Sequence, residues 1–164
     1  MLIRPVVVGL CFGLAALGGA ARLASAQARA TAGGGMDPDE AAVHEFVLTV
    51  DKCDRYAAAA RKIEAMQSSP SDPATAAEMQ KVQEANVYNV QKAEMMEKSP
   101  HLAALFKTLN ITPREFVLIP LTIMSAGVAA QYPAQAAAKL SYVTPAQIQF
   151  FKDHQADLEK WGMK

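Results

Sequence analysis

His154 is the residue of this sequence whose type and surroundings come closest to a ligand-binding group. It falls between Phe151 and Trp161 on the apolar side of the last expected helix. An imidazole in a hydrophobic pocket can be an axial ligand or can handle a proton. The alternative is a core histidine that is hydrogen-bonded to a backbone carbonyl. We favour this alternative, because no second His or Cys stands at ligand spacing.

Pro120 is the second candidate, because it stands inside an uncharged run that should form a helix. It should free the carbonyl of Phe116 and bend the helix axis, and a buried amide of Gln83 or Asn86 would then meet that carbonyl. The small residues at 125–127 either line a ligand cavity beside the bend or let helices approach closely. We favour close approach.

The remaining candidate groups have simpler structural explanations. Cys53 lies on an apolar helix side, which predicts a buried, unreactive thiol. Met95 and Met96 stand near His101, but no Met-x-x-Met pattern repeats, so we expect core packing rather than soft-metal binding. The Cys-x-x-Cys-His motif of covalent haem is absent, as is any Ser/His/Asp arrangement. We therefore expect no enzyme, no metal site and no resident cofactor.

The N-terminus has the parts of a secretory signal. Arg4 supplies the positive charge, an apolar run follows, and Ala24-Ser25-Ala26 matches the small-x-small cleavage pattern. We expect a signal peptide over 1–26, a flexible leader over 27–36 and a single helical domain over 37–164. A retained membrane anchor is the less favoured alternative, because the uncharged run is at the lower length limit for a membrane span. The expected location is periplasmic or secreted.

Composition limits the possible partners. The 164 residues suit one domain, and 16 basic against 16 acidic residues give no basic excess, which argues against nucleic-acid binding. Removal of Arg4 and Arg22 with the signal leaves a formal charge of −2. Cys11 is removed as well, so Cys53 has no partner for an internal disulfide.

The helix starts carry the strongest local signals. In three segments a capping residue is followed directly by Pro, and Glu or Gln stands three residues after the capping residue. This is the pattern of a capping box. Asp37 and Asp39 then also favour the dipole of the first helix. The expected helices cover 38–66, 73–98, 100–109, 113–131 and 145–161, with further turns over 134–140. The first helix has an alternative, in which Thr49 caps a new start at Val50.

The helix over 113–131 differs from the others, because Phe116 to Ala130 carries no charge on any side. A helix that is apolar all round is buried all round. We therefore expect an all-α protein: a small bundle of about five helices around this nearly all-apolar central helix.

Two resemblances accompany this pattern. The segment 48–52 with Tyr56, the segment 112–116 and the segment 149–154 together resemble exported bacterial all-helical proteins of unassigned function. This resemblance implies fold and compartment. The capping boxes that begin at Thr112 and Thr144 are similar to the Leu-Thr-x-x-Gln motif of Spy-like periplasmic proteins, which implies a chaperone-like or metal-stress role.

We thus expect an exported, non-enzymatic interaction module with a stress- or chaperone-like role. The alternative is a carrier of a small apolar ligand or non-covalent haem in a pocket near His154 and Pro120. The partner would be a protein or a small apolar ligand. We expect no nucleic acid and, after signal cleavage, no membrane. The oligomeric state stays open.

Overall fold

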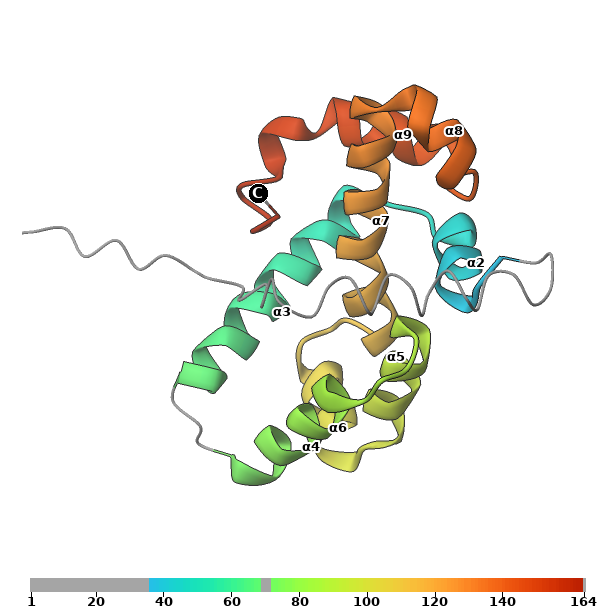
Figure 1. The fold of residues 1–164 in the computed structure, drawn as a ribbon. Coiled ribbons are helices and arrows are strands. Elements are labelled where there is room, and N and C mark those ends of the chain that lie inside the picture. Colours follow the sequence, from blue (N-terminus) through green and yellow to red (C-terminus); the bar gives the residue numbers. More distant parts are fainter. Residues whose placement is uncertain (1–35, 69–71, 164) are drawn as a thin grey trace, which may run out of the picture. The chain divides into compact units, whose positions relative to one another are not determined.

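The computed structural model describes residues 36–68 and 72–163. These residues form eight α-helices and one 3-10 turn with no strand, so the expected all-α class is confirmed (Figure 1). The elements are α2 (Pro38–Glu45), α3 (Val50–Ser68), α4 (Pro73–Glu84), α5 (Asn89–Lys98), α6 (Pro100–Thr108), α7 (Pro113–Gln131), α8 (Pro133–Lys139), α9 (Pro145–Asp153) and η1 (Gln155–Asp157). The expected signal peptide over 1–26, and the expected leader up to residue 35, lie outside the described residues.

The expected capping boxes begin α2, α7 and α9. The Glu115 N–H donates to Thr112 Oγ1 over 3.0 Å, and the Gln147 N–H donates to Thr144 Oγ1 over 3.3 Å. Each box also returns a hydrogen bond from the cap residue's own N–H, and each helix has Pro in its first turn. Local sequence therefore determines where these three helices begin.

The first expected helix is broken, as the alternative at Thr49 predicts. α2 ends at Glu45, and α3 begins at Val50 with the Lys52 N–H donating to Thr49 Oγ1 over 3.3 Å. The Thr49 hydroxyl caps the new helix start, which favours a break here over one continuous helix.

The second expected helix, 73–98, is wrong as one element. α4 ends at Glu84 and α5 begins at Asn89. The reason is a cap from another helix: Asp39 of α2 accepts the backbone N–H groups of Asn89 and Val90, both over 2.9 Å. The first N–H groups of a helix have no acceptor within the helix, and here Asp39 supplies one. A tertiary contact therefore stabilises the break.

The last expected helix, 145–161, is wrong beyond Asp153. The His154 backbone leaves the helical region at φ −115° and ψ 21°, and η1 and further turns follow. The segment then brings Trp161 to α3, where its Nε1–H donates to Asp54 Oδ1 over 2.9 Å. Because the helix ends at Asp153, the chain can turn and bury the Trp161 ring. Trp161 is 1% exposed.

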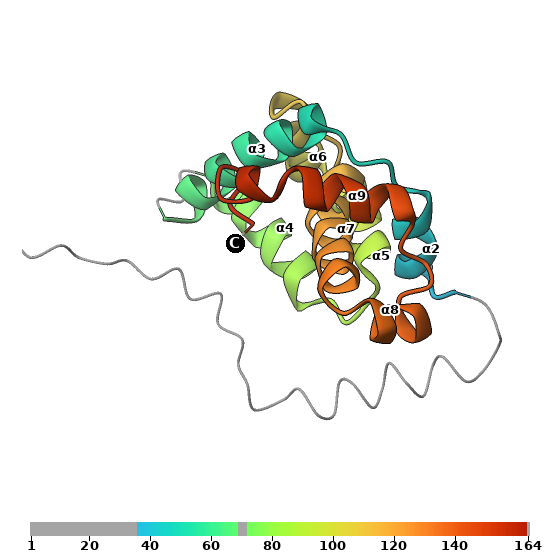
Figure 2. The ribbon, with the colours of Figure 1, turned by 90° about the horizontal axis from the view of Figure 1, so that it is seen from above.

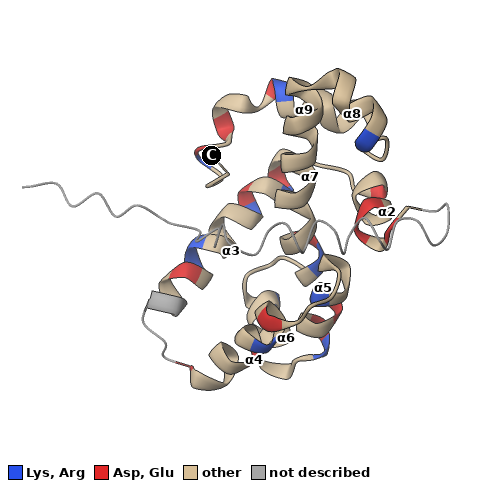
Figure 3. Ribbon diagram, in the orientation of Figure 1, with Lys and Arg blue, Asp and Glu red and all other residues tan. Residues whose placement is uncertain are grey.

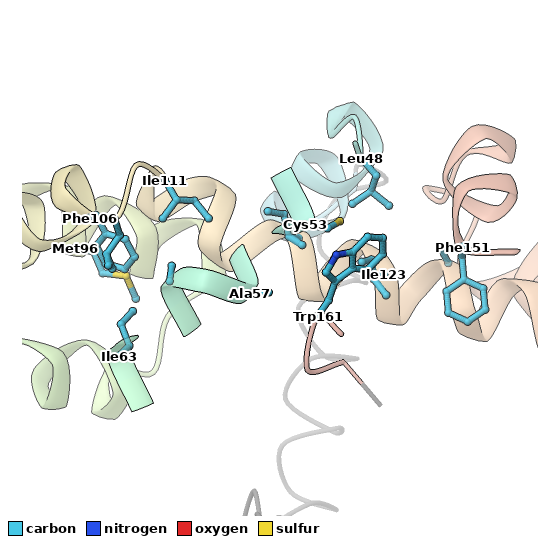
Figure 4. Close-up of a cluster of buried hydrophobic side chains, with 14 of the residues drawn as sticks. Leu48, Cys53, Ala57, Ile63, Met96, Phe106, Ile111, Ile123, Phe151 and Trp161 are labelled. Atoms are coloured by element: carbon cyan, nitrogen blue, oxygen red, sulfur yellow. The ribbon is translucent and has the colours of Figure 1, made fainter. Parts of the chain in front are cut away.

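α7 is the central helix, with the expected bounds of 113 to 131. It packs against α2, α3, α5, α8 and α9, and α9 crosses it in the view from above (Figures 1 and 2). It has the length and hydropathy of a membrane-spanning helix, yet half of it is buried inside the domain. The core around it includes Cys53 of α3, Phe106 of α6 and Trp161 of the C-terminal segment (Figure 4).

The expectation that α7 is buried on every side is wrong for one face. Met124 and Val128 are 69% and 48% exposed, and Tyr132 at the C-cap is 54% exposed. Helices cover the other faces of α7, whereas these apolar side chains reach solvent.

Candidate functional site

His154 lies at the C-cap of α9, and its side chain is 28% exposed. Its Nδ1 is 3.0 Å from Asp157 Oδ2. Both facts differ from the favoured expectation of a core histidine bonded to a backbone carbonyl. The helix ends one residue before His154, so the ring is at the domain surface instead of on a buried helix face.

Aromatic rings surround the His154 imidazole. The ring centroids of Phe150 and Trp161 lie 4.5 Å and 5.8 Å from it, and Phe150 stacks on Trp161 at 6.1 Å. When Nδ1–H donates to Asp157, Nε2 keeps its lone pair, which is the form that binds a metal ion or accepts a proton. The cluster thus holds one imidazole with a fixed orientation.

Asp54 holds this cluster against α3. It accepts the Trp161 Nε1–H, and Lys160 Nζ lies 2.8 Å from Asp54 Oδ1. The hydrogen bond from Lys160, with a further one from Trp161, lowers the pKa of Asp54 below its usual value. The Arg61 guanidinium adds a hydrogen bond to the Lys160 carbonyl over 2.7 Å. The C-terminal segment is therefore fastened by polar contacts as well as by the buried indole.

The expected arrangement around Pro120 is only partly present. Gln83 and Asn86 are exposed, so neither is the buried amide that was to meet the Phe116 carbonyl; that expectation is wrong. Gln83 is on the exposed side of α4, and Asn86 lies in the connection between α4 and α5. Two residues after Pro120, Thr122 is fully buried, and its Oγ1 has no hydrogen-bond partner among the described residues.

Gly127 marks the point where α7 and α9 approach closely. A Cβ atom built on Gly127 would lie 2.9 Å from Phe151 Cε2. Of the two interpretations of the small residues at 125–127, this contact supports close helix approach.

Cys53 and His101 both have structural roles: Cys53 is buried in the core, and His101 pairs with Glu78. Cys53 is 0% exposed, as expected, and burial raises the pKa of its thiol to about 12. His101 Nδ1 lies 2.8 Å from Glu78 Oε1, and Glu78 also accepts the N–H groups of His101 and Leu102 at the start of α6. Met96 is buried in the core, as expected.

Two polar side chains join distant segments, and the sequence analysis missed both connections. Gln147 is 3% exposed, and its Nε2 donates to the carbonyls of Val43 and Phe46 over 2.6 Å and 2.8 Å. Arg55 donates to the Asn110 carbonyl over 2.9 Å and pairs with Glu115. The Gln at the end of the third capping box was the available signal, because a cap alone is equally well served by Glu.

The third candidate for a functional site is the exposed apolar surface formed by α7 and its C-cap residue. Met124, Val128 and Tyr132 are spaced four residues apart and so lie along one side of the helix; we call them the α7 strip. Charged residues are absent from 116–138, and Figure 3 shows the upper part of α7 and most of α8 without charge. Such a surface can bury apolar groups of a partner.

Comparisons with protein families, with curated proteins and with solved structures find no match.

Proposed function

We propose that this chain is an exported, non-enzymatic interaction module with a stress- or chaperone-like role, and that the α7 strip binds apolar side chains of another protein. The observation that carries the proposal is the exposure of three large apolar side chains on one uncharged helix side. The signal peptide expected over 1–26 supports a periplasmic or secreted location.

The chemistry of the strip defines the kind of partner. Burial of apolar surface is worth roughly 25 cal/mol per Å² and needs no complementary charge. Since the strip has no charged neighbour along 116–138, binding should depend little on salt concentration. Exposed apolar segments of unfolding proteins fit this chemistry.

The test is suppression of aggregation of reduced insulin B chain, followed by light scattering with the full chain present. We expect suppression by the wild type, and loss of about half or more of it in Met124→Lys and Val128→Lys. Val47→Lys is the matched control, because Val47 is also exposed, at 66%, but lies between α2 and α3. Wild type without effect on scattering, or equal loss in the control, would contradict the proposal.

The second candidate is a carrier of non-covalent haem, and the geometry of His154 favours it specifically. Asp157 orients the ring, and two aromatic side chains flank it. The probe is haemin added to the full chain. If His154 is a haem ligand, haemin added to the wild type should show a shifted Soret band. The shift should be lost in His154→Ala and should persist in His44→Ala. Equal spectra for the two variants would exclude a ligand role of His154.

A further inference from the structure

Met124 is the most exposed large apolar residue in the part of the chain that the structure describes, at 69%. Among the methionines within 36–68 and 72–163, only Met36, at 50%, is also exposed, whereas the others are partly or fully buried. Met96, for example, is 7% exposed and belongs to the core. An oxidant must reach a thioether before it can react, so exposure makes Met124 an accessible oxidation site.

Met124 is also placed where oxidation changes the character of a surface. It is the first residue of the α7 strip, and no charged residue stands between 116 and 138. Methionine sulfoxide is polar, whereas the thioether is apolar. A sulfoxide at 124 therefore puts a strong hydrogen-bond acceptor beside Val128 on an uncharged helix side. Met36 precedes α2 and has no place in the strip.

The fold can tolerate oxidation at this position. Other faces of α7 pack against α3, α5 and α9, while the Met124 side chain reaches solvent. A sulfoxide oxygen at 124 is thus hydrated and costs no buried polar group. The same change at Met96 would place an oxygen in the core, where a polar group without a hydrogen bond is destabilising. Oxidation at 124 can therefore alter the surface and leave the domain folded.

We propose that Met124 is a reversible oxidation site that controls the apolar character of the α7 strip, with hydrogen peroxide as the oxidant. The effect on partner binding rests on the proposed function. A lone pair of Met124 Sγ attacks one peroxide oxygen, and the O–O bond breaks. The sulfur loses two electrons and becomes the sulfoxide, and the second oxygen leaves as water.

The reverse step needs a thiol-dependent methionine sulfoxide reductase. Two thiols of the reductase system become a disulfide, the sulfoxide oxygen leaves as water, and the thioether is restored. The proposed periplasmic or secreted location places Met124 in an oxidising compartment. The strip is then apolar when Met124 is reduced and partly polar when it is oxidised.

The first experiment treats the full chain with hydrogen peroxide and follows each methionine by peptide mapping with mass spectrometry. Met124 should be oxidised at least about tenfold faster than the buried Met96. The circular dichroism spectrum should stay unchanged while Met124 reacts. Equal rates at 124 and 96, or loss of the helical spectrum as Met124 reacts, would overturn the proposal.

The second experiment measures apolar surface as retention of the full chain on a hydrophobic-interaction column, each variant being compared with its own untreated sample. Peroxide should decrease the retention of the wild type. Met124→Leu should lose most of this decrease, and the matched control Met36→Leu should keep most of it. Reductases for the two sulfoxide epimers should restore retention. A decrease of the same size in Met124→Leu, or no decrease in the wild type, would overturn the proposal.

Light scattering separates this proposal from the proposed function. Peroxide-treated wild type should suppress aggregation less than untreated wild type, and Met124→Leu should lose this sensitivity to peroxide. Equal suppression before and after oxidation of Met124 would overturn control of binding. An untreated wild type without effect on scattering contradicts the proposed function alone, because peptide mapping and chromatography still decide whether oxidation of Met124 controls the apolar surface.

Discussion

Gln147 illustrates how one side chain has two structural roles. Its Oε1 accepts the Thr144 N–H over 2.8 Å, as any capping box requires. Its Nε2 also satisfies the Val43 and Phe46 carbonyls where the chain leaves α2. A buried carbonyl without a donor costs about 1–3 kcal/mol, so the second role contributes more to stability than the cap.

Gln147→Glu should therefore lower the free energy of unfolding by about 2–4 kcal/mol, because a carboxylate keeps the cap but donates to neither carbonyl. The matched control is Glu40→Gln in the first capping box, with an expected change within about 0.5 kcal/mol. Urea unfolding followed by circular dichroism measures both. Equal effects of the two substitutions would show that Gln147 is no more than a cap.

The Glu78–His101 pair predicts a pH dependence of stability. The hydrogen bond to Glu78 raises the pKa of His101 above 6.5, and the hydrogen bond to His101 lowers the pKa of Glu78 below 4.5. The histidine's contribution is complete below about pH 6.5 and is lost as the pH rises through the raised value. The glutamate's contribution is complete above about pH 4.5 and is lost as the pH falls through the lowered value.

The pair thus stabilises the fold most between these two ordinary pKa values. The thermal midpoint of the wild type should decrease when the pH is raised from about 5.5 to about 8.5. The decrease should be smaller in His101→Gln. Thermal scans of both proteins at the two pH values provide the measurement. A fall of the same size in His101→Gln would assign the pH dependence to other groups.

At the scale of elements, the helix starts with a local cap and the break at Thr49 could be predicted, whereas the break before Asn89 and the end of α9 could not. Starts depend on neighbours within four residues, such as Thr112 with Glu115. The break before Asn89 depends on Asp39, which lies 50 residues earlier, and the end of α9 depends on the contact of Trp161 with Asp54. Sequence periodicity continues through such breaks because it contains no information about a distant cap.

The contact between α7 and α9 gives a prediction at the same scale. Ala is normally favoured over Gly inside a helix by about 1 kcal/mol. At Gly127 the added methyl would press on Phe151, so Gly127→Ala should instead lower stability by about 1–2 kcal/mol.

A double-mutant cycle with Phe151→Leu checks this cause. The cost of Gly127→Ala should become smaller in the Leu background, with a coupling of about 1 kcal/mol in denaturant unfolding. Additive effects would mean that Phe151 does not limit the space at Gly127.

At the scale of the whole molecule, composition and periodicity predicted the all-α class and the central helix, but not its open face. A helix that is apolar on every side has no polar side to reveal which face reaches solvent, so the exposure of Met124 and Val128 became evident only from the packing. The same limit applies to His154, whose position depends on where α9 ends.

Native mass spectrometry of the chain purified from its own cells tests the account most directly, because it reports processing and ligand content together. We predict a polypeptide that begins at Gln27 and carries no haem or other small molecule. A polypeptide that retains haem or another small molecule, and loses it in His154→Ala, would contradict the interaction module and identify a carrier.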